Sequence, residues 1–478
     1  MTLDPQTCYR ALRARDARFD GRFFVAVSST RIYCRPVCTV KPPRRENCRF
    51  FPSAAAAEAA GYRPCLRCRP ELAPGNASVD ATSRLAQAAA GLIEDGALAE
   101  TRLEALAARL GVTGRHLRRA FAAEFGVAPV QFAQTQRLLL AKRLLTETAL
   151  PVTEIAFASG FGSVRRFNAL FRERYCMQPA RLRRIQAAGA ADVLEFELAF
   201  RPPYDWAAML DFLGARAIAG VEEVQEGRYR RTVRIAADGR EHRGWIEVAP
   251  SAKRPALRVA VSASLARAVP AVLSRVKALM DLACQPLEVA RVLGPLAAAR
   301  PGLRVPGAFD GFEVAVRAIL GQRISVAAAR TLAARLADAF GDPVATPFAS
   351  LGTLFPQASR LAGLRRGQLA QLGVPAVRAQ AIVALAGAVA AGELVLAPEA
   401  DVETTLAKLR ELPGVGEWTA QIIAMRVLGW PDAFPHTDLG VMRSLGETDP
   451  RRVLAAAERW RPWRAYAVMH LWQSNRKG

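Results

Sequence analysis

Four of the eight cysteines in the sequence lie in two close pairs. Cys34 and Cys38 form a C-x3-C pair, Cys65 and Cys68 form a C-x2-C pair, and 26 residues separate the two pairs. Each pair places two thiolates close enough to share one ion, and two such pairs complete a tetrahedral zinc site. The spacing predicts one zinc ion with four cysteine ligands, but it does not distinguish a structural site from a reactive one. The other cysteines have no partner at ligand spacing and are interpreted as ordinary small apolar residues: Cys8, Cys48, Cys176 and Cys284.

A second group of residues that could do chemistry lies near the other end of the sequence. Gly414 and Gly416 interrupt a helical region, and such a turn can bring backbone N–H groups against a phosphate because glycine lacks a Cβ. Asp438 could be only a helix N-cap, and a buried tryptophan such as Trp418 or Trp472 is more often part of a core.

Two basic helical units lie between these two groups. Residues 103–125 contain a helix, a turn at Gly111 and a second helix, and residues 152–175 repeat this pattern. Glycine permits the sharp angle between the helices, and a basic second helix suits the major groove of DNA. The pattern predicts two helix-turn-helix units, and the alternative is a helical bundle with a solvated basic face. The arginines expected to contact DNA are Arg115, Arg118, Arg165 and Arg166.

Length and composition limit the number of domains and the kinds of partner that these motifs can serve. The chain has 478 residues, which corresponds to about three domains. Lysine and arginine number 66 against 43 acidic residues, a net charge of +23 that points to nucleic acid first and to an anionic membrane surface second. A GC-rich genome that raises arginine and alanine together is the alternative explanation. Hydrophobic residues make up 51% of the chain, which excludes a mainly disordered protein.

The sequence indicates a protein of the cytoplasm. Its first twenty residues contain neither an apolar signal region nor a cleavage pattern. The most apolar run, residues 381–392, is shorter than the ~20 residues that span a bilayer. We therefore expect a cytoplasmic, nucleoid-associated protein with no membrane partner, whose cysteines favour metal or catalysis over disulfides.

Charge and periodicity divide the chain into four parts. Residues 1–190 carry 30 basic and 15 acidic residues, a net charge of +15, and the remainder carries 36 and 28, a net charge of +8. A loop-rich part with a strand near residues 22–28 is followed by a helical part, a part with mixed strands and helix, and a second helical part. Breaks in the pattern predict domains at residues 1–76, 77–190, 191–300 and 301–478.

Several stretches of the first part resemble the N-terminal domain of the Ada adaptive-response family: residues 32–38 (Ile-Tyr-Cys-Arg-Pro-Val-Cys), 45–47, 50–51 and 61–70 (Gly-Tyr-Arg-Pro-Cys-Leu-Arg-Cys-Arg-Pro). In that family a zinc-bound thiolate removes a methyl group from a methylphosphotriester in DNA, once and irreversibly. The resemblance implies that Cys34 is the acceptor and that Arg63 and Arg67 contact DNA. Methylating one of four thiolates makes the site less negative, so DNA affinity is expected to rise.

The helix-turn-helix pair is similar to the AraC-type regulators. The resemblance rests on residues 121–129 and 171–179, which close the two units, and such domains also follow the zinc module in Ada proteins. Ada proteins often continue into an O6-alkylguanine transferase with a Pro-Cys-His-Arg motif. This sequence contains no such motif, so we expect that activity to be absent.

The second half resembles a DNA glycosylase. Residues 412–416 (Leu-Pro-Gly-Val-Gly) and 434–439 (Phe-Pro-His-Thr-Asp-Leu) are typical of the helix-hairpin-helix superfamily, and residues 312–322 and 461–472 match the AlkA family of DNA-3-methyladenine glycosylases. The resemblance implies that the enzyme flips an alkylated base out of the duplex, stacks it on Trp418 and Trp472, and stabilises an oxocarbenium-like sugar with Asp438.

The sequence departs from the glycosylase pattern at several positions. Trp418 replaces the lysine of bifunctional relatives, and no cysteine follows Cys284, so we expect a monofunctional glycosylase with no iron–sulfur cluster. An AlkA pocket tyrosine falls near Ile422, which predicts a less aromatic pocket. The residue that wedges into the vacated base stack is apolar in AlkA, whereas Arg323 follows Gln322 here. Gln322 and Arg323 are both expected to contact DNA, as are the hairpin glycines.

Together these patterns predict a multidomain fold: a small zinc-bound α/β module, an all-α double helix-turn-helix, an α+β domain and an all-α helix-hairpin-helix glycosylase domain. The predicted function is DNA alkylation repair and its regulation. Cys34 accepts methyl groups and activates transcription, while Asp438 supports excision of bases such as 3-methyladenine. The alternative is a methylation-responsive regulator whose glycosylase domain only binds DNA. Double-stranded DNA is the expected partner, RNA polymerase is a further candidate, and a monomer is expected.

Overall fold

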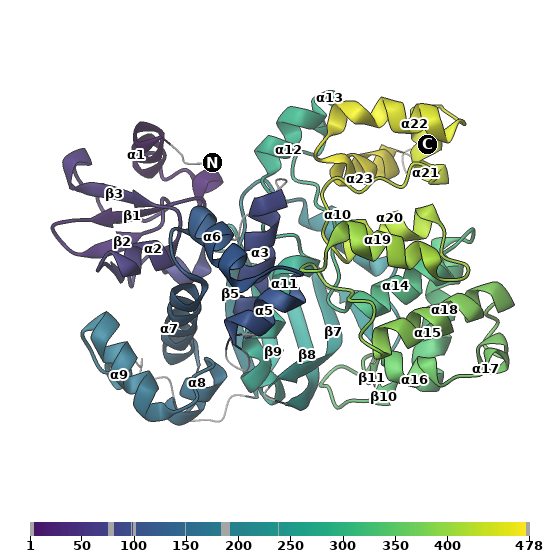
Figure 1. Cartoon of the computed structure of the whole chain (residues 1–478), viewed down its shortest axis with the longest axis horizontal. Helices are drawn as coiled ribbons and strands as arrows, with labels where there is room; N and C mark the ends of the chain where they lie inside the picture. Colours follow the sequence, from purple (N-terminus) through teal and green to yellow (C-terminus); the bar gives the residue numbers. More distant parts are fainter. Residues whose placement is uncertain are drawn as a thin grey trace.

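The fold was analysed in a computed structural model, which describes residues 4–74, 81–96, 98, 102–148, 150–182, 192–237 and 239–474. A small sheet module lies at one end of the molecule, and the glycosylase-like helices lie at the other (Figure 1). Helices α3, α5 and α6 and the large sheet lie between them in this view. The expected domain limits at residues 76 and 77 and at residues 190 and 191 fall outside the described residues, and the limit at 300 and 301 falls in the turn after α13.

The N-terminal module is a four-stranded sheet with two helices. Its strand order is β3-β1-β2-β4, in which β4 runs parallel to β2 and the other pairs are antiparallel. Asp4 and Ser53 cap the two helices through their side chains, as short polar residues commonly do. The elements are α1 (Pro5–Arg13), β1 (Phe24–Val27), β2 (Ile32–Cys34), β3 (Cys48–Phe51), α2 (Ala54–Ala59) and β4 (Arg63–Pro64).

The next part is helical, as predicted. The long helix α7 connects two pairs of shorter helices, and its apolar side chains contribute to the cores of three parts of the molecule. The elements are α3 (Ala81–Glu94), α5 (Leu103–Arg109), α6 (Gly114–Phe125), α7 (Pro129–Glu147), α8 (Val152–Ala158) and α9 (Val164–Tyr175).

A five-stranded antiparallel sheet of order β5-β9-β8-β7-β6 follows. Apolar residues alternate along β5 and β9, so one face of each strand points into the core. The elements are β5 (Val193–Ala199), α10 (Trp206–Gly214), β6 (Glu222–Gln225), β7 (Arg228–Ala237), β8 (Arg240–Pro250), β9 (Ala256–Ser262), the 3-10 helix η5 (Ala263–Ala268) and α11 (Val269–Leu279). The predicted mixture of strands and helix in this part is thus confirmed.

The remaining elements are almost all helices, as predicted, with one two-residue strand pair. They are α12 (Pro286–Leu293), α13 (Pro295–Ala298), α14 (Gly311–Leu320), α15 (Val326–Phe340), β10 (Asp342–Pro343), β11 (Thr353–Leu354), α16 (Ala358–Ala362), α17 (Arg366–Ala370), α18 (Ala376–Ala390), α19 (Val402–Glu411), α20 (Glu417–Arg426), α21 (Leu439–Leu445), α22 (Pro450–Ala457) and α23 (Arg464–Ser474).

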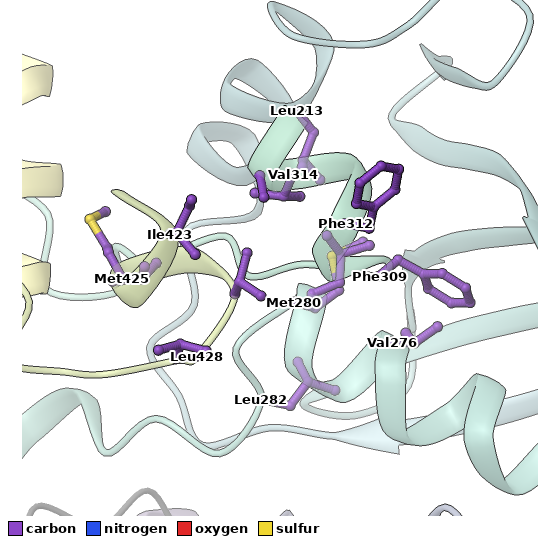
Figure 2. Close-up of a cluster of buried hydrophobic side chains, with 14 of the residues drawn as sticks. Leu213, Val276, Met280, Leu282, Phe309, Phe312, Val314, Ile423, Met425 and Leu428 are labelled. Carbon is purple, nitrogen blue, oxygen red and sulfur yellow. The ribbon is translucent and has the colours of Figure 1, made fainter. Parts of the chain in front are cut away.

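One continuous apolar core joins most of these parts. It extends from Leu138 on α7 through the second helix-turn-helix unit and the five-stranded sheet to Leu471 on α23. Figure 2 shows the region where α10, α11, α14 and α20 meet, with Met280 and Phe312 among the labelled side chains. The zinc module has only small separate clusters of its own. No helix in the described part of the chain combines the length and apolar character that a bilayer-spanning segment needs.

Candidate functional site

The four paired cysteines meet at one point of the N-terminal module. The parallel pairing of β2 with β4 places Tyr33 opposite Pro64, so the next residues, Cys34 and Cys65, leave the two strands at the same edge. The four sulfur atoms of Cys34, Cys38, Cys65 and Cys68 lie within 4.8 Å of one another. Sulfurs arranged tetrahedrally around zinc at ~2.3 Å are about 3.8 Å apart, so this cluster fits one zinc ion. The predicted zinc site is therefore confirmed.

Arg35 holds the second pair of cysteines in place. Its buried side chain donates from Nε to Asp20 Oδ1 at 2.8 Å and from Nη1 to the carbonyl oxygen of Cys68 at 3.2 Å. The backbone N–H of Arg35 donates to the sulfur of Cys68 at 3.4 Å. Arg35 is thus a structural residue rather than a free DNA contact. Arg67 is exposed and Arg63 is half-buried on β4, so both remain available at the surface of this module.

The four cysteines of the cluster differ in exposure. Cys38 and Cys65 are buried, whereas Cys34 and Cys68 are partly exposed. Among the described residues no backbone N–H donates to the sulfur of Cys34, in contrast to Cys68. Within the described residues, the sulfur of Cys34 thus accepts fewer backbone hydrogen bonds than the sulfur of Cys68.

The cysteines outside the cluster were interpreted as small apolar residues, and this is correct for three of them. Cys8, Cys48 and Cys284 are buried, and burial raises the pKa of the Cys8 thiol to about 11. Cys176 is exposed, so its interpretation was wrong. It ends α9 with a φ of +54°, a left-handed turn that turns its side chain away from the helical core.

Helix α7 carries buried polar side chains into the zinc module. Lys142, which is 2% exposed, donates from Nζ to Glu71 Oε2 at 2.6 Å and to the carbonyl oxygen of Cys65 at 3.5 Å. Glu58 on α2 accepts the hydroxyl protons of Tyr33 and Thr135 at 3.0 and 2.9 Å. Burial raises the pKa of the Glu58 carboxyl to about 7. The zinc module therefore docks on the helix-turn-helix part through specific buried contacts.

The two helix-turn-helix units have the predicted geometry. Gly111 and Gly160 adopt φ values of +68° and +80° in the turns, where glycine meets no Cβ penalty. Thr113 and Ser163 cap the second helices by accepting backbone N–H groups. The four predicted arginines are exposed: Arg115 and Arg118 on α6, and Arg165 and Arg166 on α9. Arg118 forms an ion pair with Glu104 at 2.7 Å.

The glycine turn lies between α19 and α20 with both glycines exposed. Gly414 has a φ of +77°, and an added Cβ would lie 3.2 Å from the carbonyl oxygen of Val377, so a larger residue is disfavoured both by backbone strain and by a close contact. Gln322, in the turn between α14 and α15, donates from Nε2 to the carbonyl oxygen of Gly414 and to Thr419 Oγ1, both at 2.9 Å. These two hydrogen bonds join the hairpin to the turn that carries Gln322 and Arg323.

Asp438 joins three separate elements. Its Oδ2 accepts the indole N–H of Trp418 at 2.8 Å, and its Oδ1 accepts the indole N–H of Trp472 at 2.9 Å. Oδ1 also accepts the backbone N–H of Val441, which makes Asp438 the N-cap of α21. The interpretation of Asp438 as a helix N-cap is therefore confirmed, and two indole rings hold the same carboxylate in place.

A pocket of about 440 Å³ contains Asp438, Trp418 and Trp472. Phe212 forms a further aromatic wall, stacked on Trp472 with the planes 18° apart and the centroids separated by 6.3 Å. Ile422 lines the pocket as well. Phe212 escaped the sequence analysis because it lies on α10, about 200 residues before the hairpin, and nothing distinguishes it there from a core phenylalanine.

Arginines surround this pocket. Arg330 and Arg443 are exposed at its rim. Arg317 lies deeper and is neutralised by Glu222 at 2.7 Å and Glu313 at 3.0 Å, while the Arg216 guanidinium lies 3.8 Å from the centroid of the Phe212 ring. Arg317 is thus neutralised inside the pocket, whereas no carboxylate among the described residues pairs with Arg330 or Arg443 at the entrance, where DNA phosphates would pass.

Four protein families match successive parts of this chain. They are the metal binding domain of Ada over residues 7–71, a helix-turn-helix domain over 106–185, the AlkA N-terminal domain over 195–310, and the HhH-GPD superfamily base excision DNA repair protein over 316–453. A Mycobacterium tuberculosis protein named probable bifunctional transcriptional activator/DNA repair enzyme AlkA is 39% identical over 98% of this chain and 96% of its own length. The chain belongs to this bifunctional family.

The two halves of this family member match two different proteins of Escherichia coli. DNA-3-methyladenine glycosylase 2 is 40% identical over 58% of this chain and 96% of its own length. The bifunctional transcriptional activator/DNA repair enzyme Ada is 38% identical over 27% of this chain and 35% of its own length. The resemblances to Ada, AraC-type regulators and AlkA, and the multidomain fold class, are therefore confirmed.

Proposed function

We propose that this protein repairs alkylated DNA at two separate centres and uses the first of them as a transcriptional switch. The zinc module takes a methyl group from a methylphosphotriester, and the glycosylase half excises alkylated bases such as 3-methyladenine. The functional units are those expected from the sequence, with limits at 1–76, 77–190, 191–300 and 301–478. The observation that carries the proposal is the cluster of Asp438, Trp418 and Trp472 in one pocket of a chain that also holds four clustered cysteines.

At the first centre, Cys34 is the methyl acceptor. Zinc bound by the four sulfurs supplies the positive charge that keeps the thiolates deprotonated at neutral pH. The sulfur of Cys34 forms a bond to the methyl carbon, and the bond from that carbon to the phosphotriester oxygen breaks. The electron pair stays on the oxygen, which leaves a phosphodiester anion and a methyl thioether. Partial exposure of Cys34 and the absence of a backbone N–H at its sulfur within the described residues support this choice.

The methylated module binds DNA more strongly. A thioether is neutral where a thiolate is negative, so the centre repels phosphate less after the transfer. Arg63 and Arg67 beside the cysteines, together with Arg115, Arg118, Arg165 and Arg166 on the helix-turn-helix units, then hold promoter DNA. RNA polymerase is the partner that such a bound activator contacts, and we propose that the protein acts as a monomer on cytoplasmic, nucleoid DNA.

At the second centre, Asp438 stabilises the sugar as the base leaves. An N-alkylated purine already carries a positive charge, so cleavage of its glycosidic bond gives the base both electrons and leaves it neutral. Positive charge appears on the sugar, where the Asp438 carboxylate opposes it, and water then adds and releases a proton. Trp418, Trp472 and Phe212 stack on the cationic base through their ring faces. Gly414, Gly416 and Gln322 hold the DNA backbone beside the pocket.

The decisive experiment measures release of free bases from methylated duplex DNA. Asp438→Asn keeps the cap on α21 but places an amide against the indole N–H donors, so we expect base release to fall by about 10²- to 10³-fold while DNA binding persists. Asp449→Asn, which changes the exposed cap of α22, is the matched control. Equal activity of Asp438→Asn and wild type would contradict the role of Asp438. No release by wild type would favour the alternative of a glycosylase domain that only binds DNA.

A separate assay tests the first centre. Cys34→Ala is expected to accept no methyl from a methylphosphotriester, whereas Cys176→Ala, at an exposed cysteine outside the cluster, transfers it normally. Mass spectrometry of the protein after reaction gives the site of methylation. Methyl on another cysteine would overturn the assignment of the acceptor.

A further inference from the structure

One neutral polar side chain of the base pocket has no partner in the described part of the fold. Gln473 lies near the end of α23 and lines the pocket together with Met469 and Trp472. The spacing i, i+3 and i+4 puts these three side chains on one face of the helix. Gln473 is half-buried, and among the described residues none forms a hydrogen bond with its amide. Its donor and its acceptor both remain available to a ligand in the pocket.

The other polar side chains of the pocket offer donors or acceptors, but not both. Arginines only donate, and the indole N–H groups of Trp418 and Trp472 are already directed at Asp438. The Asp438 carboxylate only accepts, from these two indoles and from the backbone N–H of Val441. Among the described side chains that line the pocket, Gln473 is therefore the one that presents a donor and an acceptor side by side.

A flipped purine presents the same combination of groups. Flipping separates the Watson–Crick edge of the base from its partner, and an enzyme can then form hydrogen bonds to that edge. Methylation of adenine at N3 and of guanine at N7 leaves this edge unchanged. On this edge adenine places the N6 amino donor next to the N1 acceptor, whereas guanine places the O6 acceptor next to the N1–H donor. The order of donor and acceptor is thus opposite in the two bases.

An amide side chain can match both orders. Turning its terminal group by half a rotation exchanges the carbonyl oxygen and the NH2 group, which have nearly the same shape. In one orientation the Gln473 amide accepts from adenine N6 and donates to N1. In the other orientation it donates to guanine O6 and accepts from N1–H. A carboxylate or a guanidinium cannot do this, because each offers one kind of group only.

We propose that Gln473 recognises the Watson–Crick edge of the flipped base and lets one pocket accept both alkylated adenine and alkylated guanine. This inference rests on the proposed glycosylase function, to which it adds a residue that determines the range of bases. Gln473 holds the base while Asp438 acts at the sugar, so recognition and bond cleavage belong to different residues.

The test compares two bases that are released from the same DNA by the full chain. Duplex DNA treated with a methylating agent contains 3-methyladenine and 7-methylguanine, and chromatography separates the two free bases. Both lesions are cationic in DNA, so a charge added to the pocket acts on both alike. The ratio of the two kcat/KM values therefore measures recognition of the edge and does not depend on the amount of folded protein.

Two variants at this position separate hydrogen-bond recognition from packing. Gln473→Glu offers two acceptors, which match the adjacent N1–H and N2 amino donors of guanine but oppose the N1 acceptor of adenine. We expect the ratio of 7-methylguanine to 3-methyladenine to rise about 10-fold, within the range of one bidentate contact. Gln473→Met keeps the length of the side chain without polar groups, so both rates are expected to fall about 10-fold at an unchanged ratio.

Gln371→Glu is the matched control. Gln371 is exposed at the end of α17 and outside the pocket, so the same change of charge is expected to leave both rates and their ratio at wild-type values. An unchanged ratio in Gln473→Glu, or wild-type rates in Gln473→Met, would overturn the inference and leave the proposed function intact. If wild type releases neither base, the proposed function fails and the inference fails with it.

Discussion

The four-cysteine centre and the base pocket are built in opposite ways. The cysteines come from two short segments that one parallel strand pair brings together, and the surrounding module has only small apolar clusters. Asp438, Trp418, Trp472 and Phe212 come from four elements spread over more than half of the chain, and one large core holds them in position. The first centre depends on its metal, and the second depends on packing.

Electrostatics also differ between the two regions. The cysteine cluster concentrates negative charge beside Arg63 and Arg67, so a change at one sulfur alters how the surface meets DNA. Among the described residues that line the pocket, Asp438 is the one carboxylate, and two indoles hold its oxygens; Arg317 is neutralised inside, while Arg330 and Arg443 are exposed at the rim. One region is suited to change its charge once, and the other to keep its charge through many turnovers.

The largest expected effect comes from removing the metal. Chelation or Cys38→Ser is expected to unfold the zinc module, because a structural zinc site contributes about 10 kcal/mol and the module's own core is small. Methyl transfer disappears and protease cleaves residues 4–74, while base release stays within about twofold of wild type because the pocket belongs to another core. Cys176→Ser is the matched control. A parallel loss of base release would show that the two centres are not independent.

A smaller effect is expected at the contact between α7 and the zinc module. Lys142→Met leaves Glu71 buried with Arg69 as its remaining partner and removes the donor to the Cys65 carbonyl. We expect a loss of about 3 kcal/mol in the stability of the zinc module, since one partner of a buried ion pair is missing. Urea-induced zinc release, followed with a zinc-sensitive dye, measures this loss. Lys408→Met, at an exposed lysine of α19, serves as the control, and unchanged zinc release in Lys142→Met would refute the prediction.

The pocket's aromatic wall gives the next effect. Phe212→Leu keeps an apolar side chain but removes the ring stacked on Trp472, so we expect kcat/KM for base release to fall about 10-fold, the equivalent of ~1.4 kcal/mol. Methyl transfer is unaffected. Phe348→Leu changes a ring that packs on Trp245 away from the pocket and is expected to be silent. Equal losses in both variants would mean that Phe212 acts only through stability.

The smallest effect is a pH dependence confined to the zinc side. The folded-state pKa of Glu58 is raised by burial from 4.5 to about 7, so the carboxyl is protonated in the fold at low pH. Its contribution to stability is complete below the unfolded pKa and is lost as pH rises through about 7. Glu58→Gln keeps a neutral group there. We expect the Tm of wild type to fall relative to Glu58→Gln between pH 5 and pH 7 and to change no further above that range, and parallel Tm curves from pH 5 to pH 7 would contradict this.

Some parts of the fold and of the two centres were predictable because their signals are local. The two cysteine pairs and the glycine turns at Gly111 and Gly414 each depend on a few neighbouring residues. Local spacing sets local geometry, so these predictions were correct. The apolar interpretation of Cys176 failed because exposure at a helix end depends on the turn that follows the helix.

The sequence by itself determined the ligands of the metal, the basic helices, and the presence of an aspartate and tryptophans with the spacing of a glycosylase. Only the tertiary structure decided that Phe212 joins the pocket and that Lys142 reaches the carbonyl of Cys65. The physical reason is distance along the chain. Contacts between residues separated by 70 to 260 positions depend on how whole elements pack, and no local pattern encodes them.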